Sequence, residues 1–209
     1  MHNTLIYDLD LTLIDSLEAC AEGANLLAEH FGLEKKSLEQ IRIALSLPTE
    51  QFWLSLWGKV EPPWSAYFFN DIVPKVSSLI KLYPYTEEIL QAGKDKGYLQ
   101  AIATNRINPW HDLAKLNIAK YFDTAVGSDN VPRPKPEPDM LLTILKQLGV
   151  DASRALFVGD SVSDMVCAKN AGLKSLGLLQ GGSSQQDLLA AGASVVRENL
   201  EAGRDVLNC

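Results

Sequence analysis

The chain has 209 residues and a formal net charge of -7, and 46% of its residues are hydrophobic. This length suits one large domain, or one domain that carries a smaller insertion. The acidic balance and the lack of a lysine and arginine cluster argue against a nucleic-acid partner, because such proteins need basic surfaces to neutralise phosphates. No stretch approaches the ~20 apolar residues of a membrane span, and three widely spaced cysteines fit a reducing compartment. We therefore expect a soluble, cytoplasmic protein.

Short apolar runs that end in polar residues or glycine alternate with helical patterns along most of the chain. The expected strands are residues 4–7, 99–103, 124–126, 155–158 and 175–178. The expected helices between and after the later strands are residues 86–96, 109–116, 138–148 and 163–171. This alternation predicts an α/β fold of the Rossmann-like type, a doubly wound parallel sheet with helices on both faces. Ligands of such sheets bind beyond the carboxyl ends of the strands.

Residues 16–82 interrupt this alternation. They read as four consecutive helices without a strand, at residues 17–31, 37–45, 49–57 and 64–82. Three of the four tryptophans lie in this segment, at a spacing more typical of helix packing than of a ligand cage. We therefore expect a catalytic core of residues 1–15 and 83–209 and a small helical cap of residues 16–82.

Asp8 and Asp10 close the first expected strand. Two residues that are two positions apart lie on one face of an extended chain. Carboxylates so close repel each other and raise each other's pKa unless a cation lies between them. The pair predicts a divalent metal, a shared proton or both; the alternative is a polar strand end with two solvated aspartates.

Two further strand ends carry groups that can bind an anion. Thr104 and Asn105 follow the second strand, and their hydroxyl and amide groups can donate hydrogen bonds to an anion. The loop of residues 131–138 has a proline at every second position. Such a loop is stiff, so it can hold Lys135 at a fixed point.

The fourth expected strand leads to Asp160, and Asp164 follows where the next helix could begin. Taken alone, Asp164 is equally well explained as a charge that complements the helix dipole. A parallel sheet would bring these strand ends together and join up to four carboxylates, a hydroxyl and a lysine in one crevice. Oxygen ligands of this kind suit Mg²⁺.

The ordered set of motifs resembles the haloacid dehalogenase superfamily, in its phosphoglycolate phosphatase-like branch, over essentially the whole chain. The first motif is Asp-x-Asp-x-Thr from Asp8 to Thr12, and the second is Thr104. The third is Lys135 in a Lys-Pro-x-Pro context, and the fourth is Gly-Asp-x-x-x-Asp from Gly159 to Asp164.

The resemblance implies a mechanism. Asp8 would attack phosphorus to form an aspartyl-phosphate, and Asp10 would act as acid and then as base, which requires a raised pKa that neighbouring carboxylates could supply. Thr104 would hold the phosphoryl oxygens, and Lys135 would neutralise charge. The implied Mg²⁺ ligands are the carboxylates of Asp8, Asp160 and Asp164 and the backbone carbonyl of Asp10.

The chain departs from the family pattern at two points. Leu11 stands where glycine is common, and we expect it to take an ordinary negative φ. Ser46 stands where the cap turn of the family has glycine, so the substrate preference carried by that turn is open. Arg106, beside Asn105, and Arg42 in the cap are candidates for the carboxylate of phosphoglycolate, or else packing and surface arginines.

The leading hypothesis is a Mg²⁺-dependent phosphatase of a small phosphorylated metabolite that acts as a monomer or homodimer. A sugar phosphomutase or a pyrophosphatase of the same superfamily is the alternative within this chemistry. An acidic pocket with a threonine and a lysine would also fit a phosphorylatable receiver-like switch module. A catalytically idle member that binds a partner through its cap is the remaining possibility.

Overall fold

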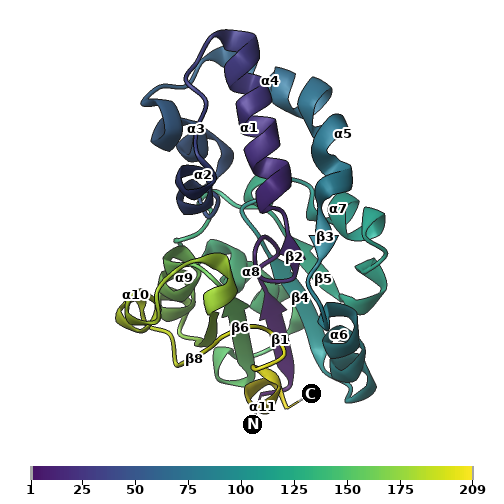
Figure 1. Ribbon diagram of the computed structural model, residues 1–209. Coiled ribbons are helices and arrows are strands. Elements are labelled where there is room, and N and C mark those ends of the chain that lie inside the picture. The colour runs from purple at the N-terminus through teal and green to yellow at the C-terminus, as the bar shows by residue number, and fades with distance from the viewer. Residues whose placement is uncertain (1, 209) are drawn as a thin grey trace.

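The computed structural model describes residues 2–208 and contains a six-stranded parallel sheet in the order β5-β4-β1-β6-β7-β8 (Figure 1). Its strands are β1 Thr4–Tyr7, β4 Leu99–Ala103, β5 Thr124–Val126, β6 Ala155–Gly159, β7 Lys174–Leu178 and β8 Val195–Arg197. The predicted parallel α/β fold is thus confirmed. The short strand β8 lies at the sheet edge and is only half buried, so its apolar pattern is too weak to mark it in the sequence.

Strand β1 lies between β4 and β6, and Tyr7 aligns with Ile102 on one side and Val158 on the other. All four residues of β1 are buried, because helices cover both faces of the sheet. The helices that follow the sheet strands are α6 Thr86–Asp95, α7 Pro109–Lys115, α8 Asp139–Leu148, α9 Val162–Ala171, α10 Gln185–Ala191 and α11 Arg204–Leu207. This register places the carboxyl ends of β4, β1 and β6 next to one another.

The sheet separates two apolar cores. Leu5 and Tyr7 pack on one face with side chains from α6, α7 and α11. Ile6 and Phe157 pack on the other face with side chains from α8 and α9. The β1 side chains therefore alternate between the two cores, as the pleat requires.

A third apolar core lies within a layer of helices beyond the carboxyl ends of the strands (Figure 1). We call this part, residues 17–79, the helical layer. It consists of α1 Leu17–Phe31, α2 Leu38–Ala44, α3 Thr49–Trp57, α4 Pro62–Tyr67, the π-helical turn η1 Phe68–Ile72, α5 Val73–Val76 and the 3-10 turn η2 Ser77–Leu79. Trp53 and Trp64 are almost fully buried in its core, in agreement with a packing role for the aromatic residues.

The expected single helix of residues 64–82 was wrong. The π turn η1 ends at Ile72, two residues before Pro74, which has no N–H to donate to the preceding turn. The helical stretch then ends at Leu79, and Lys81–Leu82 forms strand β3. A two-residue strand is too short to show an alternating pattern, so the expectation of no strand in this segment failed here.

Strand β3 pairs antiparallel with β2 Ile14–Asp15, and this ribbon carries both connections between the sheet and the helical layer. Tyr83 N and Thr86 Oγ1 both donate to the Leu13 carbonyl, at 3.0 Å each, and fix the ribbon to the sheet side. We propose from this arrangement that residues 16–82 form a cap on a core of residues 1–15 and 83–209. Within residues 2–208, no helix combines the length and the apolar character that a membrane crossing demands.

Candidate active site

The turn after β1 sets the positions of Asp8 and Asp10. Asp8 N donates to the Val158 carbonyl at 2.8 Å, and Leu11 N donates to the Ile14 carbonyl at 2.8 Å, which reverses the chain. Leu11 has φ 53°, so the expected negative φ was wrong. The tight reversal requires a left-handed residue, a conformation that glycine adopts most easily. Leu11 is 3% exposed and packs into the core of the helical layer, and this burial offsets the backbone cost.

Three carboxylates meet at the ends of β1 and β6. Asp8, Asp160 and Asp164 each offer an oxygen, and these oxygens lie within 4.8 Å of one another. We call these residues the acid cluster. Asp164 lies in the first turn of α9, where Ser161 N and Ser161 Oγ donate to its Oδ2 at 3.1 and 2.6 Å. A Cβ at Gly181 would lie 1.8 Å from Asp160 Oδ2, so only glycine leaves room for this carboxylate.

Lys135 lies inside the acid cluster. Its Nζ is 2.7 Å from Asp8 Oδ1 and 2.7 Å from Asp164 Oδ1, and its side chain is 2% exposed. Burial opposes the charge of Lys135, but the two carboxylates outweigh it and hold its pKa above the ordinary value. The prediction that the proline-rich loop brings Lys135 to the strand ends agrees with this position.

The acid cluster carries more negative charge than Lys135 can balance. Burial raises the pKa of Asp8 to about 7, with Lys135 opposing and Asp164 and Asp10 adding repulsion. Burial and the charges of Asp164 and Asp8 hold the pKa of Asp160 well above its usual range, although Thr12 Oγ1 donates to Asp160 Oδ1 at 2.9 Å. Buried carboxylates with excess charge fit a divalent cation, and their oxygens are ligands that Mg²⁺ prefers. Asp8, Asp160 and Asp164 could hold such an ion.

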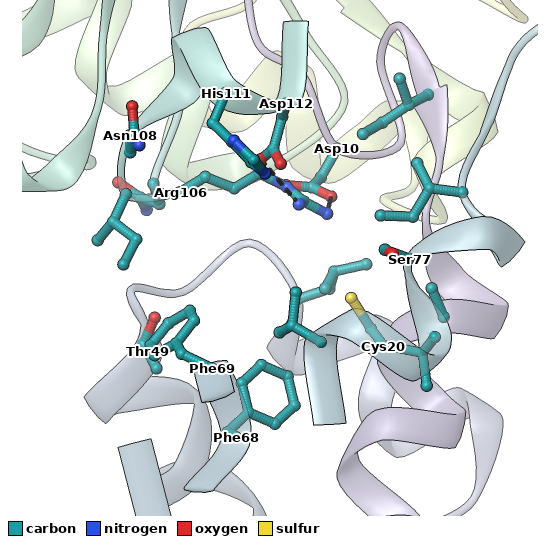
Figure 2. Close-up of a pocket in the computed structure, with 18 of the residues that line it drawn as sticks. Asp10, Cys20, Thr49, Phe68, Phe69, Ser77, Arg106, Asn108, His111 and Asp112 are labelled. Atoms are coloured by element: carbon teal, nitrogen blue, oxygen red, sulfur yellow. Dashed lines mark hydrogen bonds and ion pairs between the residues drawn. The ribbon is translucent and has the colours of Figure 1, made fainter. Parts of the chain in front are cut away.

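Asp10 lies in a different electrostatic environment (Figure 2). Arg106 binds its carboxylate in a bidentate manner, with Nε 2.7 Å from Oδ2 and Nη2 2.8 Å from Oδ1, and Ser16 Oγ donates to Oδ1. Arg106 Nη1 also contacts Asp112 Oδ2 at 3.1 Å.

The charge of Asp10 follows from these contacts. Burial alone would raise the pKa of Asp10, but Arg106 and Ser16 outweigh it and lower the pKa below its ordinary value. The expected raised pKa was therefore wrong, because that expectation considered the neighbouring carboxylates and not Arg106.

The other predicted residues border these two groups. Thr104 is buried at the end of β4, and its Oγ1 accepts from Arg106 N at 3.2 Å. Asn105 connects three segments, since its Nδ2 donates to Ser46 O at 2.9 Å and its Oδ1 accepts from Lys135 N at 3.1 Å. Asn105 therefore fixes the lysine loop and touches the helical layer.

The two candidate arginines for a substrate carboxylate have different surroundings. Arg106 is bound by Asp10 and Asp112, as described above. Arg42 lies on α2 of the helical layer, 3.7 Å from Glu39, and lines a cavity of about 290 Å³ that the acid cluster also borders. Arg42 therefore faces the small cavity, whereas Arg106 is paired with two carboxylates of the protein itself.

Several site residues had not been singled out from the sequence. Ser161 could have been recognised, because Ser-x-x-Asp at the start of a helix is a capping-box pattern. Ser16 and Asp112 carry no such signal. Their contacts with Asp10 and Arg106 depend on how the turn after β1 and helix α7 meet in space.

Comparisons with known proteins agree with this geometry. A family model described as haloacid dehalogenase-like hydrolase matches residues 5–178. "Probable phosphatase IndB" of Dickeya dadantii is 30% identical over 207 residues, which cover 94% of this chain and 89% of that protein. The phosphoglycolate phosphatase of Pseudomonas fluorescens Pf-5 is 30% identical over 211 residues, with 95% and 77% covered.

Solved structures share the fold over the full length. The structure of a predicted phosphoglycolate phosphatase from Haemophilus somnus superposes with a TM-score of 0.88 at 22% identity and covers 100% of this chain and 98% of that one. The resemblance to the phosphoglycolate phosphatase-like branch is thus confirmed, and the protein is an enzyme of the phosphatase type. The chain belongs to the haloacid dehalogenase-like hydrolases.

Proposed function

We propose that the protein is a Mg²⁺-dependent phosphatase that hydrolyses a small phosphate monoester through an aspartyl-phosphate on Asp8. The observation that carries this proposal is the acid cluster, in which three buried carboxylates meet and one lysine pairs with two of them, Asp8 and Asp164. A phosphate ester is itself an anion, so it needs additional positive charge to approach Asp8.

Each residue has a role in this proposal. Asp8 attacks phosphorus, and Lys135, 2.7 Å from its carboxylate, offsets negative charge between nucleophile and substrate. Asp8, Asp160, Asp164 and the Asp10 carbonyl would hold Mg²⁺, which neutralises phosphate charge and orients the ester. The Thr104 hydroxyl and turn N–H groups would hold phosphoryl oxygens.

Asp10 is proposed as the group that moves the proton. Its ionised form, which Arg106 favours, is suited to activate the water that cleaves the aspartyl-phosphate. Donation of a proton to the leaving oxygen in the first step requires Asp10 to take up a proton, so the contacts with Arg106 must weaken there. Arg106 therefore acts as a positioning residue in this proposal.

A small phosphorylated metabolite is the proposed substrate, which is the class that the relatives named phosphoglycolate phosphatase also suggest. Arg42, which lines the small cavity beside Asp8 and Asp160, is the proposed additional cation for the anionic substrate. We propose further a cytoplasmic monomer or homodimer with no nucleic-acid or membrane partner.

The test is phosphate release from p-nitrophenyl phosphate and from a panel of small phosphometabolites, with Mg²⁺ and with EDTA. We expect Mg²⁺-dependent turnover that Asp8→Asn lowers by a factor on the order of 10³ or more. Asp95→Asn, an exposed aspartate on α6, is the matched control and should retain activity. Metal-independent turnover, or full activity of Asp8→Asn, would contradict the proposal.

The same assays separate the alternatives. A sugar phosphomutase would interconvert sugar phosphates without phosphate release, and a pyrophosphatase would prefer pyrophosphate in the panel. A receiver-like switch would accumulate a long-lived phosphate on Asp8 without turnover.

A further inference from the structure

A second cavity, of about 550 Å³, lies between the helical layer and the loops that follow β4 (Figure 2). It has the size of a small-molecule site. In Figure 2, Arg106, His111 and Asp112 line its core side, and Phe68, Phe69 and Cys20 line the side of the helical layer. Neither the metal cluster nor the proposed attack on phosphorus uses this space.

The side formed by the helical layer is aromatic. Phe68 and Phe69 are only half buried although they lie between two layers, and both line the cavity. Their rings meet edge to face with centroids 5.5 Å apart, and Phe68 also contacts Trp53 at 4.9 Å. The π turn η1 begins at these two residues, and this turn brings two neighbouring aromatic side chains to one cavity. Such turns are frequent at functional sites.

The core side is polar, and its guanidinium is already paired with carboxylates. Arg106 donates to Asp10 at 2.7 and 2.8 Å and to Asp112 at 3.1 Å, so its guanidinium is occupied by two carboxylates. Lys115, another lining cation, is exposed and donates to Ser77 Oγ across the cavity. A carboxylate that entered near Asp10 would compete with Asp10 and Asp112 for Arg106, whereas a neutral ring would meet apolar side chains.

The larger cavity adjoins the proposed site of chemistry. Asp10 and Leu45 line both this cavity and the small cavity that the acid cluster borders. An ester with its phosphoryl group at Asp8 has its leaving oxygen near Asp10, if Asp10 is the proton donor. The leaving group can then extend past Asp10 into the aromatic cavity.

We propose that the larger cavity binds the leaving group of the substrate and selects phosphate monoesters of aromatic alcohols over esters that carry a carboxylate. This inference rests on the proposed function and specifies its substrate class. The stacking and apolar contacts of Phe68 and Phe69 supply the selectivity, and Arg106, which Asp10 and Asp112 already engage, offers no free charge to a carboxylate.

The test compares benzyl phosphate, ethyl phosphate and phosphoglycolate as substrates. All three release an alkoxide-type leaving group, so the intrinsic reactivity of an activated phenol does not enter. We expect kcat/KM for benzyl phosphate to exceed those for the other two by about tenfold or more, the effect of a few apolar contacts.

Variants locate this preference. Phe69→Ala should lower the ratio of kcat/KM for benzyl over ethyl phosphate by about tenfold. Phe31→Ala removes another half-buried phenylalanine of the helical layer that does not line either cavity, and it should leave the ratio unchanged. Val73→Trp, which fills the cavity from α5, should also lower the ratio, so the test survives if Phe69→Ala does not fold.

A binding experiment separates failure of this inference from failure of the proposed function. Calorimetry of the wild type with Mg²⁺ should show benzylphosphonate binding at least about tenfold more tightly than phosphonoacetate. No turnover of any ester would overturn the proposed function, while the phosphonates would still report on the cavity. Turnover or binding that favours phosphoglycolate and phosphonoacetate would overturn the inference and leave the phosphatase intact.

Discussion

Asp8 and Asp10 are two positions apart on one turn, yet the protein gives their carboxylates opposite electrostatic surroundings. Asp8 shares Lys135 with Asp164 and lies within 4.8 Å of Asp160, so negative charge is in excess and its pKa rises to about 7. Asp10 receives two hydrogen bonds from Arg106 and one from Ser16, and its pKa falls.

The difference shows how one short turn can serve two chemical roles. Charge repulsion around Asp8 leaves the acid cluster ready for a cation, whereas Asp10 is already balanced without one. In many enzymes, two carboxyl groups whose surroundings separate their pKa values take different catalytic roles. Four experiments test this contrast.

The largest effect is expected from Lys135→Met. Removal of this buried ammonium leaves Asp8 and Asp164 without their shared cation and should lower the free energy of unfolding by about 3–5 kcal/mol without metal. Phosphatase activity should be lost as well. Urea unfolding with and without Mg²⁺ measures this, with Lys146→Met, an exposed lysine, as the control. An unchanged unfolding midpoint would show that the acid cluster does not depend on Lys135.

The pH dependence of the metal-free protein comes next. A carboxyl whose pKa is raised on folding stabilises the fold in its protonated form, so stability should decrease by up to a few kcal/mol as the pH rises from about 4 to about 7. Mg²⁺ should counter this loss, because it favours the ionised form. Melting temperatures across this pH range, with EDTA and with Mg²⁺, measure it. In Asp8→Asn the slope should shrink, whereas a slope equal to that of the wild type would assign the titration to other groups.

Arg106→Gln should raise the pKa of Asp10, so that Asp10 becomes a buried carboxyl with excess negative charge around it, as Asp8 is. The variant should lose about 2–4 kcal/mol of unfolding free energy at neutral pH, since Asp10 stays buried without its cation. In the wild type, the lowered pKa of Asp10 stabilises the folded state at pH values above about 4, the ordinary pKa of an aspartate. This contribution is lost in acid, where Asp10 becomes protonated. The difference in unfolding free energy between the variant and the wild type should therefore shrink below about pH 4. Arg133→Gln breaks an exposed bidentate pair with Asp139 and should cost less. A deficit that is constant with pH would indicate lost packing alone.

Ser16→Ala should have the smallest effect. Asp10 would keep Arg106 and lose one hydroxyl donor to its charged carboxylate, which corresponds to about 1.5 kcal/mol or slightly more in unfolding free energy. The exposed Ser55→Ala on α3 is the matched control. A loss as large as that of Arg106→Gln would mean that the hydroxyl, and not the guanidinium, fixes the charge of Asp10.

The sheet and the acid cluster could be predicted because their signals are local. Five strands are short apolar runs with clear ends, and the reactive residues follow those ends in chain order. Parallel topology then gathers Asp8, Lys135 and Asp160 without any knowledge of side-chain packing.

The features that were missed depend on contacts between distant segments. The left-handed Leu11 is tolerated because the helical layer buries its side chain, which no local pattern reveals. The π turn before Pro74 depends on how η1 and α5 pack on α1. Arg106 and Asp10 are 96 positions apart in the chain. Both were predicted as site residues from the sequence, but no local pattern predicts that they form a pair.

The ribbon of β2 and β3 has a consequence for how the two parts of the chain depend on each other during folding. Ile14 pairs with Leu82, and Asp15 pairs with Lys81. Residues 16–80 are therefore a long insertion whose two ends this ribbon already holds together. The entropy of closing a loop grows only with the logarithm of its length, at about 0.6 kcal/mol for each doubling. Lengthening, shortening or replacing the helical layer therefore costs the sheet little. Such changes can alter which molecules reach Asp8 while the acid cluster keeps its geometry.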